Sequence, residues 1–332
     1  MTTNKKTKLG ATGPDVFPIA LGCMGMTPGA YTTPVEAEGI ATIHAAIERG
    51  VNLLDTGDFY SLGENEMLVR RAIAGRRDKV LLSVKFGATR GPDGSWTGFD
   101  TRPVAVQNFV AYSLKRLGTE VIDIYRPTRL DPAVPIEDTV GAVADLVKKG
   151  YVRHIGLSEV GAGTIRRAAK VHPIVDVQLE YSLANRSAEE AVLPALEELG
   201  IGATLYGVLV HGLLSGSRPA SPSDFRAHLP QFAQRDRNEP LLQRFRTLAE
   251  AGGRTPAQLC IAWALAKQPT LVPAIGARTP AQLESAVGAL ERPLTAQEMG
   301  QVESLMPPNA LAGATAAASI AQLTGLVVGD ES

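Results

Sequence analysis

Residues 51–60 read VNLLDTGDFY, and residues 80–86 read VLLSVKF. Both begin as short apolar runs without polar alternation, which is typical of strands covered on both faces of a parallel sheet. Between them lies NEMLVRRAIAG at 65–75, whose apolar residues recur at helical spacing and which ends in glycine. Strand, helix and strand in this order predict a βα unit.

The same unit repeats along the chain. Strand-like runs lie at 17–22, 51–56, 80–86, 121–127, 152–158, 174–181, 201–209 and 270–276. Helical segments follow at 35–50, 65–75, 101–118, 136–150, 162–172, 188–200 and 279–290. Repeated βα units favour an α/β fold of the closed (β/α)8 TIM-barrel type over a doubly wound sheet. The first turn, LGCMGM at 21–26, also lacks the GxGxxG spacing of a dinucleotide-binding half.

Three segments exceed the minimal barrel. We expect an N-terminal β-hairpin at about 7–20, and a long loop at 211–240 followed by extra helices at 241–253 and 255–268. An Ala- and Gly-rich C-terminal tail at about 307–332 is read as a helix, a lid or a disordered segment. A length of 332 residues suggests two domains. The repeat instead predicts one barrel domain over 1–332.

Composition narrows the function classes. Lys and Arg total 33 and Asp and Glu total 34, so neither nucleic acid nor an anionic membrane is an expected partner. We find no 18-residue apolar run and no signal-peptide core, and Cys23 and Cys260 lack metal-ligand spacing. We expect a cytoplasmic protein without a disulfide scaffold or metal, either a monomer or a homo-oligomer.

Polar residues gather where strands end. Asp55 ends the second predicted strand, Lys85 ends the third, and Tyr60 follows Asp55 on the loop above. Because a barrel enzyme builds its site at the carboxyl ends of strands, these three side chains can meet. A lysine beside a phenol is expected to lower the tyrosine pKa and to make it a general acid. The alternative is a structural ion pair that Tyr60 merely covers.

Several motifs in consistent order resemble those of the aldo-keto reductases. They are KLGATG, LGCMGM, NLLDTGDFY, NEMLVRRAI, SVKFG, SLKRLGTEVIDIY, YVRHIGLSE, VQLEYSL, GLLSG and VPAIGARTPAQLE, over about residues 7 to 300. The resemblance implies a (β/α)8 barrel that transfers hydride between NADPH and a carbonyl group. It also implies that Asp55, Tyr60 and Lys85 are members of a catalytic tetrad in which Tyr60 protonates the carbonyl oxygen.

The fourth tetrad position departs from the family pattern. The resemblance implies a histidine where this chain has Thr128, in YRPTRLDP. A threonine hydroxyl can still donate to the substrate directly or through water, or it only packs. His211 is the histidine expected nearest the barrel mouth, at a position where the family usually has arginine.

The resemblance also implies an NADP(H) site. Ser158, Glu159 and Gln178 match positions that hold the nicotinamide carboxamide, and Tyr206 matches the aromatic residue that stacks on its ring. Arg278 matches the basic residue that grips the adenosine 2′-phosphate, for which the planar guanidinium fork is suited. The remaining cofactor candidates are Gly22, Met24, Leu209, Gly212, Leu214, Gly276 and Gln282.

Phe59, Phe86 and Trp96 are the candidates for an apolar substrate pocket. The favoured function is NADPH-dependent reduction of small aldehydes or ketones to alcohols. One alternative is oxidation of a secondary alcohol such as a sugar hydroxyl. The other, suggested by Thr128, is an NADP(H)-binding regulatory subunit with weak turnover.

Overall fold

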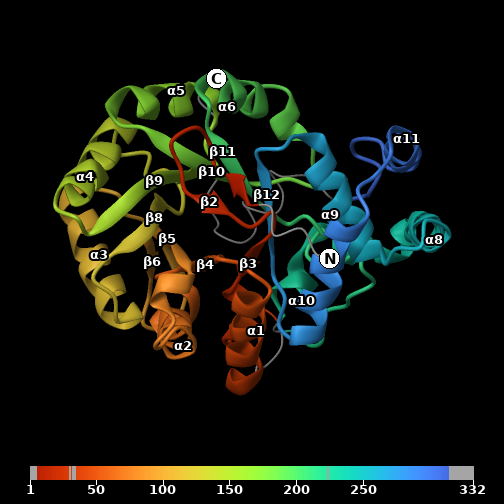
Figure 1. Cartoon of the computed structure of the whole chain (residues 1–332), viewed down its shortest axis with the longest axis horizontal. Helices are drawn as coiled ribbons and strands as arrows, with labels where there is room; N and C mark the ends of the chain where they lie inside the picture. The colour runs from red at the N-terminus through yellow and green to blue at the C-terminus, as the bar shows by residue number, and fades with distance from the viewer. Residues whose placement is uncertain (1–5, 30, 32–34, 223, 314–332) are drawn as a thin grey trace.

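The computed structural model describes residues 6–29, 31, 35–222 and 224–313. Eight parallel strands close into a barrel, and helices ring it on the outside (Figure 1). The barrel strands are β3 (Ala20–Gly22), β4 (Leu53–Gly57), β5 (Leu81–Phe86), β8 (Ile122–Pro127), β9 (Val152–Ser158), β10 (Ile174–Glu180), β11 (Gly202–Tyr206) and β12 (Leu271–Ile275). The predicted (β/α)8 barrel is confirmed.

Helices alternate with these strands. They are α1 (Glu36–Glu48), α2 (Glu64–Ala72), α3 (Pro103–Leu117), α4 (Ile136–Lys148), α5 (Ala162–Val171), α6 (Val192–Leu199) and α10 (Pro280–Val287). Extra helices α7 (Pro230–Ala233), α8 (Arg235–Ala251) and α9 (Pro256–Lys267) follow β11, and α11 (Ala296–Leu305) lies beside α8 at one edge (Figure 1). The expected extra helices after the seventh barrel strand and near the C-terminus are therefore present. Of the expected tail, residues 314–332 lie outside the described residues.

Two hairpins flank the barrel. Strands β1 (Thr7–Lys8) and β2 (Asp15–Val16) form the expected N-terminal one. Its Leu9 and Val16 pack against Leu53, Ile124 and Val272, which closes the barrel with an apolar floor. Strands β6 (Ala88–Arg90) and β7 (Trp96–Phe99) form a second hairpin, which the sequence reading did not predict.

Above the apolar floor the barrel interior becomes polar. Arg126 on β8 and Asp176 on β10 are fully buried and form an ion pair, with Arg126 Nη1 3.0 Å from Asp176 Oδ2. Gly156 on β9 makes room for them: a Cβ there would lie 2.7 Å from Asp176 Oδ1. A side chain at 156 would therefore displace the pair, which stands directly below the pocket residues.

Candidate active site

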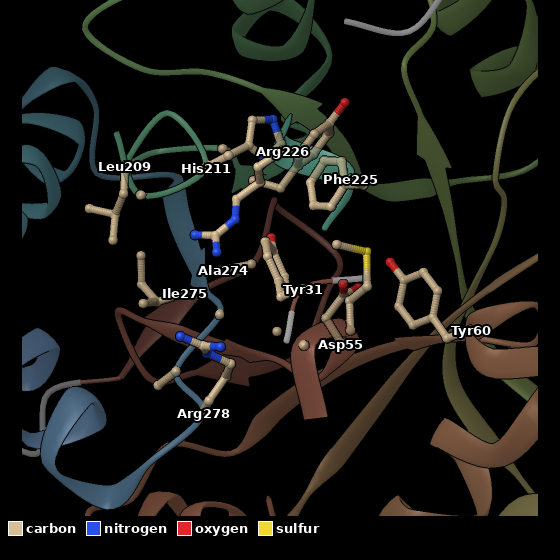
Figure 2. Close-up of a pocket in the computed structure, with 18 of the residues that line it drawn as sticks. Tyr31, Asp55, Tyr60, Leu209, His211, Phe225, Arg226, Ala274, Ile275 and Arg278 are labelled. Atoms are coloured by element: carbon tan, nitrogen blue, oxygen red, sulfur yellow. The ribbon is translucent and has the colours of Figure 1, made fainter. Parts of the chain in front are cut away.

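A cavity of about 930 Å³ opens at the carboxyl ends of the barrel strands. This volume suits a small molecule together with part of a cofactor. Figure 2 shows Asp55 and Tyr60 at one side and Arg278 at the other, with Tyr31 between them. Most of the predicted site residues line this single cavity, although their positions in the sequence span 22 to 282.

Asp55, Lys85 and Tyr60 meet as the strand ends predicted. Lys85 Nζ lies 2.5 Å from Asp55 Oδ2, and both side chains are at least nine-tenths buried. The same ammonium lies 5.1 Å from the centre of the Tyr60 ring, over its face. Asp55 also accepts hydrogen bonds from the Ser83 hydroxyl and from the Gln178 amide, each at 2.9 Å. The carboxylate on β4 is therefore fixed by side chains from two other strands, β5 and β10.

The pKa of Tyr60 shifts in the direction opposite to the one that the sequence suggested. Burial and the Asp55 carboxylate raise the pKa of Tyr60 well above its ordinary value, while Arg129 and Arg126 oppose the shift. The expected lowering of this pKa is wrong for this structure, because burial is the largest effect. Tyr60 is therefore a neutral phenol, the form that can donate a proton.

The pKa values of Asp55 and Lys85 are shifted as well. Burial acts to raise the pKa of Asp55, but Lys85 and Arg126 outweigh it and hold the pKa below its ordinary value. Burial lowers the pKa of Lys85, and the Asp55 carboxylate opposes this shift. Asp55 is therefore a carboxylate at neutral pH and supplies the negative charge next to the ammonium.

Arg126 joins this pair to the polar interior of the barrel. Its Nη2 donates to Ser83 Oγ at 2.9 Å, and Ser83 in turn donates to Asp55. Its Nη1 donates to Thr204 Oγ1 at 3.1 Å, and Thr204 donates to Asp176 at 2.7 Å. The sequence reading missed Arg126. A charged residue two positions before Thr128, and so on the same strand face, is the signal that could have found it.

Thr128 lines the cavity and is buried. Its hydroxyl donates to the Phe86 carbonyl oxygen at 2.8 Å, and its backbone amide donates to the same oxygen. The hydroxyl hydrogen is therefore not directed at the cavity. The neighbouring Arg129 guanidinium also lies in the cavity wall, 3.4 Å from Ser158 Oγ and 3.5 Å from the Tyr206 hydroxyl.

Most of the predicted cofactor residues line one part of the cavity, which we call the first arm. The wall contains Gly22, Met24, Ser158, Gln178, Tyr206, Leu209, Gly212, Gly276, Arg278 and Gln282. Arg278 stands just before α10, whose first turn is capped by the Thr279 hydroxyl. Its guanidinium lies 5.9 Å from the centre of the Tyr31 ring, and that of Arg226 lies 4.9 Å from the same ring. Arg226 forms a buried ion pair with Asp224, 2.6 Å from Nη2 to Oδ2, so the positive charge at this end of the arm comes from Arg278.

Two cofactor candidates lie outside this wall. The backbone of Glu159 is left-handed, with φ at 52°, and its carboxylate accepts from the Glu180 amide at 2.6 Å. The same carboxylate is hydrogen-bonded to Tyr206 and interacts with Arg129, and both of these residues line the cavity although Glu159 itself does not. Leu214 is buried in the hydrophobic core between the barrel and its helices. Neither residue lines the cavity, and their direct contacts with a cofactor remain predictions from the sequence.

The loop after β11 supplies further wall residues, of which Phe225 and Arg226 were not among the residues predicted from the sequence. Phe225 packs edge-on against Tyr31 at 5.1 Å between ring centres, and His211 packs on the other side of Phe225 at 5.4 Å. His211 Nε2 also lies 3.7 Å from Glu180 Oε1. Figure 2 shows His211, Phe225 and Arg226 on the side of the pocket opposite Arg278, with Phe225 toward Tyr60.

A second arm extends past Tyr60 and is aromatic. Phe59 packs edge-on against Tyr60, with 4.7 Å between ring centres, and lies 5.5 Å from Trp96. Phe99 of the β6–β7 hairpin extends the same wall. Phe86 does not belong to it. It is fully buried and stacks on Tyr125 at 4.2 Å behind the barrel wall, because its position on β5 points outward.

The first arm fits a nicotinamide dinucleotide. Its polar end offers the Ser158 hydroxyl and the Gln178 amide, which suit a carboxamide, and the Tyr206 ring lies beside them. Its far end joins Arg278 to the N-terminus of α10, a combination that suits phosphate. In the described residues, no three His, Cys, Asp or Glu side chains gather as metal ligands.

Two further findings concern the cysteines and the length of the helices. Cys23 and Cys260 are buried free thiols, and burial raises the pKa of Cys23 to about 12. Cys23 is therefore a protonated thiol beside the pocket rather than a reactive thiolate. No described helix has the length and apolarity needed to cross a bilayer.

Known proteins with similar sequences belong to one enzyme family. A model of the aldo/keto reductase family matches residues 18–307. A probable aldo-keto reductase of Glycine max is 39% identical over 316 residues, which cover 92% of this chain and 90% of that protein.

Two solved structures share the architecture. A glycerol dehydrogenase from Gluconobacter oxydans superposes with a TM-score of 0.83 at 26% identity, over 93% of this chain and 98% of the other. An aldo-keto reductase from Bacillus halodurans, solved in its holo form, gives 0.76 at 28% identity, over 92% and 97%. The chain therefore belongs to the aldo/keto reductase family, whose members are oxidoreductases that interconvert carbonyl and alcohol groups and generally bind NAD(P)H.

Proposed function

We propose that the chain reduces aldehydes or ketones to alcohols with NADPH, and that Tyr60 is the general acid. The observation that carries this proposal is the buried Asp55–Lys85 ion pair directly beneath Tyr60, in a cavity that continues to Arg278. A purely structural ion pair would not require a cavity above it. The neutral phenol, the buried ammonium and the positive far end of the first arm together suit proton donation beside a bound dinucleotide.

Each residue has a distinct task in the proposed reaction. A bound nicotinamide cofactor supplies hydride to the carbonyl carbon. The Tyr60 hydroxyl donates its proton to the carbonyl oxygen, so the product is an alcohol and the phenol becomes a phenolate. The Lys85 ammonium stabilises the phenolate electrostatically, and Asp55 holds Lys85 in place. A proton from solvent then restores the phenol.

The first arm orients the cofactor in this proposal. The Gln178 amide and the Ser158 hydroxyl would hold the carboxamide of a bound cofactor, and the Tyr206 ring would pack against its nicotinamide. Gly22 and Gly276, at the ends of neighbouring strands, leave room for the dinucleotide backbone. Because a family member can also use NADH, the phosphate-binding residue decides the preference.

Arg278 is expected to decide whether the protein prefers NADPH or NADH. Replacing Arg278 by Ala removes the guanidinium that would pair with the 2′-phosphate, and NADH lacks this phosphate. The preference for NADPH over NADH, as a ratio of kcat/KM values, should fall by about 10- to 100-fold, the worth of charge-assisted hydrogen bonds. Steady-state kinetics with both cofactors measures this ratio. An unchanged ratio would show that another residue reads the phosphate.

Thr128 is expected to limit the rate. Its hydroxyl hydrogen is used by Phe86, so Thr128→His should add a donor for the developing oxyanion. We expect kcat for small aldehydes to rise by about 10- to 100-fold, with the melting temperature nearly unchanged. Unchanged kinetics across an aldehyde panel would show that position 128 does not contact the substrate.

The reverse reaction is the second candidate. One of the structural neighbours is described as a glycerol dehydrogenase, which favours oxidation of an alcohol. The same residues serve in reverse, because a Tyr60 phenolate accepts the proton that Tyr60 donates in reduction. Initial rates in both directions with one aldehyde and its alcohol separate the two. A regulatory subunit would show neither rate while still binding the cofactor.

A further inference from the structure

The aromatic arm contains a cation that the proposed reaction does not use. Arg90 lies at the end of β6, opposite Trp96 of β7, and both line the cavity. The guanidinium carbon of Arg90 is 3.7 Å from the centre of the Trp96 ring, a close stacking contact. Its Nη1 donates to the Gly94 carbonyl oxygen at 2.8 Å, which fixes the guanidinium across the hairpin.

The charge of Arg90 has no acidic counterpart in the described part of the chain. Its Nε is buried and has no hydrogen-bond partner there. Burial lowers the pKa of Arg90, and no charged neighbour contributes to the shift. The nearby Asp93 is exposed, and its carboxylate accepts from the Ser95 amide instead. A half-buried guanidinium that lines a cavity and has no acidic partner among the described residues favours an anionic ligand.

An aromatic row connects this cation to the reacting end. Trp96 carries Arg90 on its face and lies 5.5 Å from Phe59 between ring centres. Phe59 in turn packs against Tyr60 at 4.7 Å. A flat apolar molecule can lie along this row, with its carbonyl group at Tyr60 and its other end at Arg90. The planar fork of an arginine matches a carboxylate at that end.

We propose that Arg90 is a specificity-determining residue that binds the carboxylate of an aromatic aldehyde substrate, at the end of the molecule away from the carbonyl group. This inference rests on the proposed carbonyl reduction and adds the class of substrate. Arg90 makes the contact through its guanidinium donors, and Trp96 and Phe59 contact the aromatic body.

The test compares two aldehydes of the same shape. The substrate para-carboxybenzaldehyde carries a carboxylate, and para-formylbenzamide carries a neutral amide in the same place. The measured quantity is the ratio of their kcat/KM values. We expect the wild-type ratio to favour the carboxylate by about tenfold, and Arg90→Met to reduce that preference to about one. Arg90→Lys, which keeps the charge but loses the fork, should retain part of it.

A matched control uses the same hairpin region. Arg102 is an exposed arginine that pairs with Asp100 and lies outside the cavity wall of described residues. Arg102→Met should leave the ratio at its wild-type value. A ratio that is unchanged in Arg90→Met, or a wild-type ratio that favours the amide, would overturn the inference.

A binding measurement separates this inference from the proposed reaction. The probe is para-carboxybenzyl alcohol, and its binding is followed by quenching of Trp96 fluorescence, with buried Trp263 as the constant background. We expect the dissociation constant to rise by about tenfold in Arg90→Met. If the wild type reduces neither aldehyde but shows this binding change, only the proposed reaction fails. Equal dissociation constants in wild type and Arg90→Met would overturn the Arg90 inference itself.

Discussion

Tyr60→Phe lowers kcat for aldehyde reduction by about 10²- to 10⁴-fold, the usual contribution of a positioned general acid. The substitution removes only the hydroxyl that donates the proton. The ring contacts with Phe59 and with the Lys85 ammonium remain, so the pocket keeps its shape. Steady-state rates with a reactive aldehyde measure the loss, and cofactor binding by fluorescence should change little.

A second tyrosine provides the control for this variant. Tyr112 on α3 is exposed, and Tyr112→Phe removes an equivalent hydroxyl away from the cavity. Its kcat should match the wild type. If Tyr60→Phe retains more than a tenth of wild-type kcat, another group protonates the carbonyl oxygen and the assignment of Tyr60 is wrong.

The second large effect concerns stability. Asp176→Asn leaves the fully buried Arg126 guanidinium without its counter-charge, and we expect the free energy of unfolding to fall by about 3–5 kcal/mol. Replacing both members, by Arg126→Met with Asp176→Leu, removes both charges of this pair and should recover most of this loss. Urea or guanidinium unfolding at neutral pH measures all variants.

An exposed ion pair provides the control for the effect of burial on stability. Arg166 and Glu198 are separated by 2.6 Å but are about half exposed, and Glu198→Gln should cost only about 0–1 kcal/mol. If Asp176→Asn lowers the free energy of unfolding no more than Glu198→Gln does, the charge of Asp176 does not stabilise the buried Arg126. Equal losses in the single and double variants would show that packing, not charge, dominates at this position.

The strand and helix pattern was sufficient to predict the barrel, because the strands are mostly apolar without regular polar alternation and most predicted helices end in glycine. Asp55, Lys85 and Tyr60 followed from one geometric rule, that parallel strands end at the same edge. The β6–β7 hairpin was missed because its strands are short and polar. The turn sequence GPDGS at 91–95 between Arg90 and Trp96 was its available signal.

Side-chain direction is what the sequence reading could not supply. Phe86 was expected in the substrate pocket, but it follows Lys85 on β5 and therefore points to the opposite face of the barrel wall. Glu159 was expected to contact the cofactor itself, but its carboxylate accepts from the Glu180 amide and is hydrogen-bonded to the cavity residue Tyr206, and Glu159 does not line the cavity. The rise of the Tyr60 pKa likewise depends on burial, which neighbouring charges in the sequence do not reveal.

The most direct test of the proposed function follows the absorbance of NADPH when wild-type protein is mixed with an aldehyde, beside Tyr60→Phe under identical conditions. The account predicts that wild type oxidises NADPH in proportion to alcohol formed, and that Tyr60→Phe is slower by at least about 10²-fold. Failure of the wild type to oxidise NADPH with any reactive aldehyde, or equal rates in the two proteins, would contradict it.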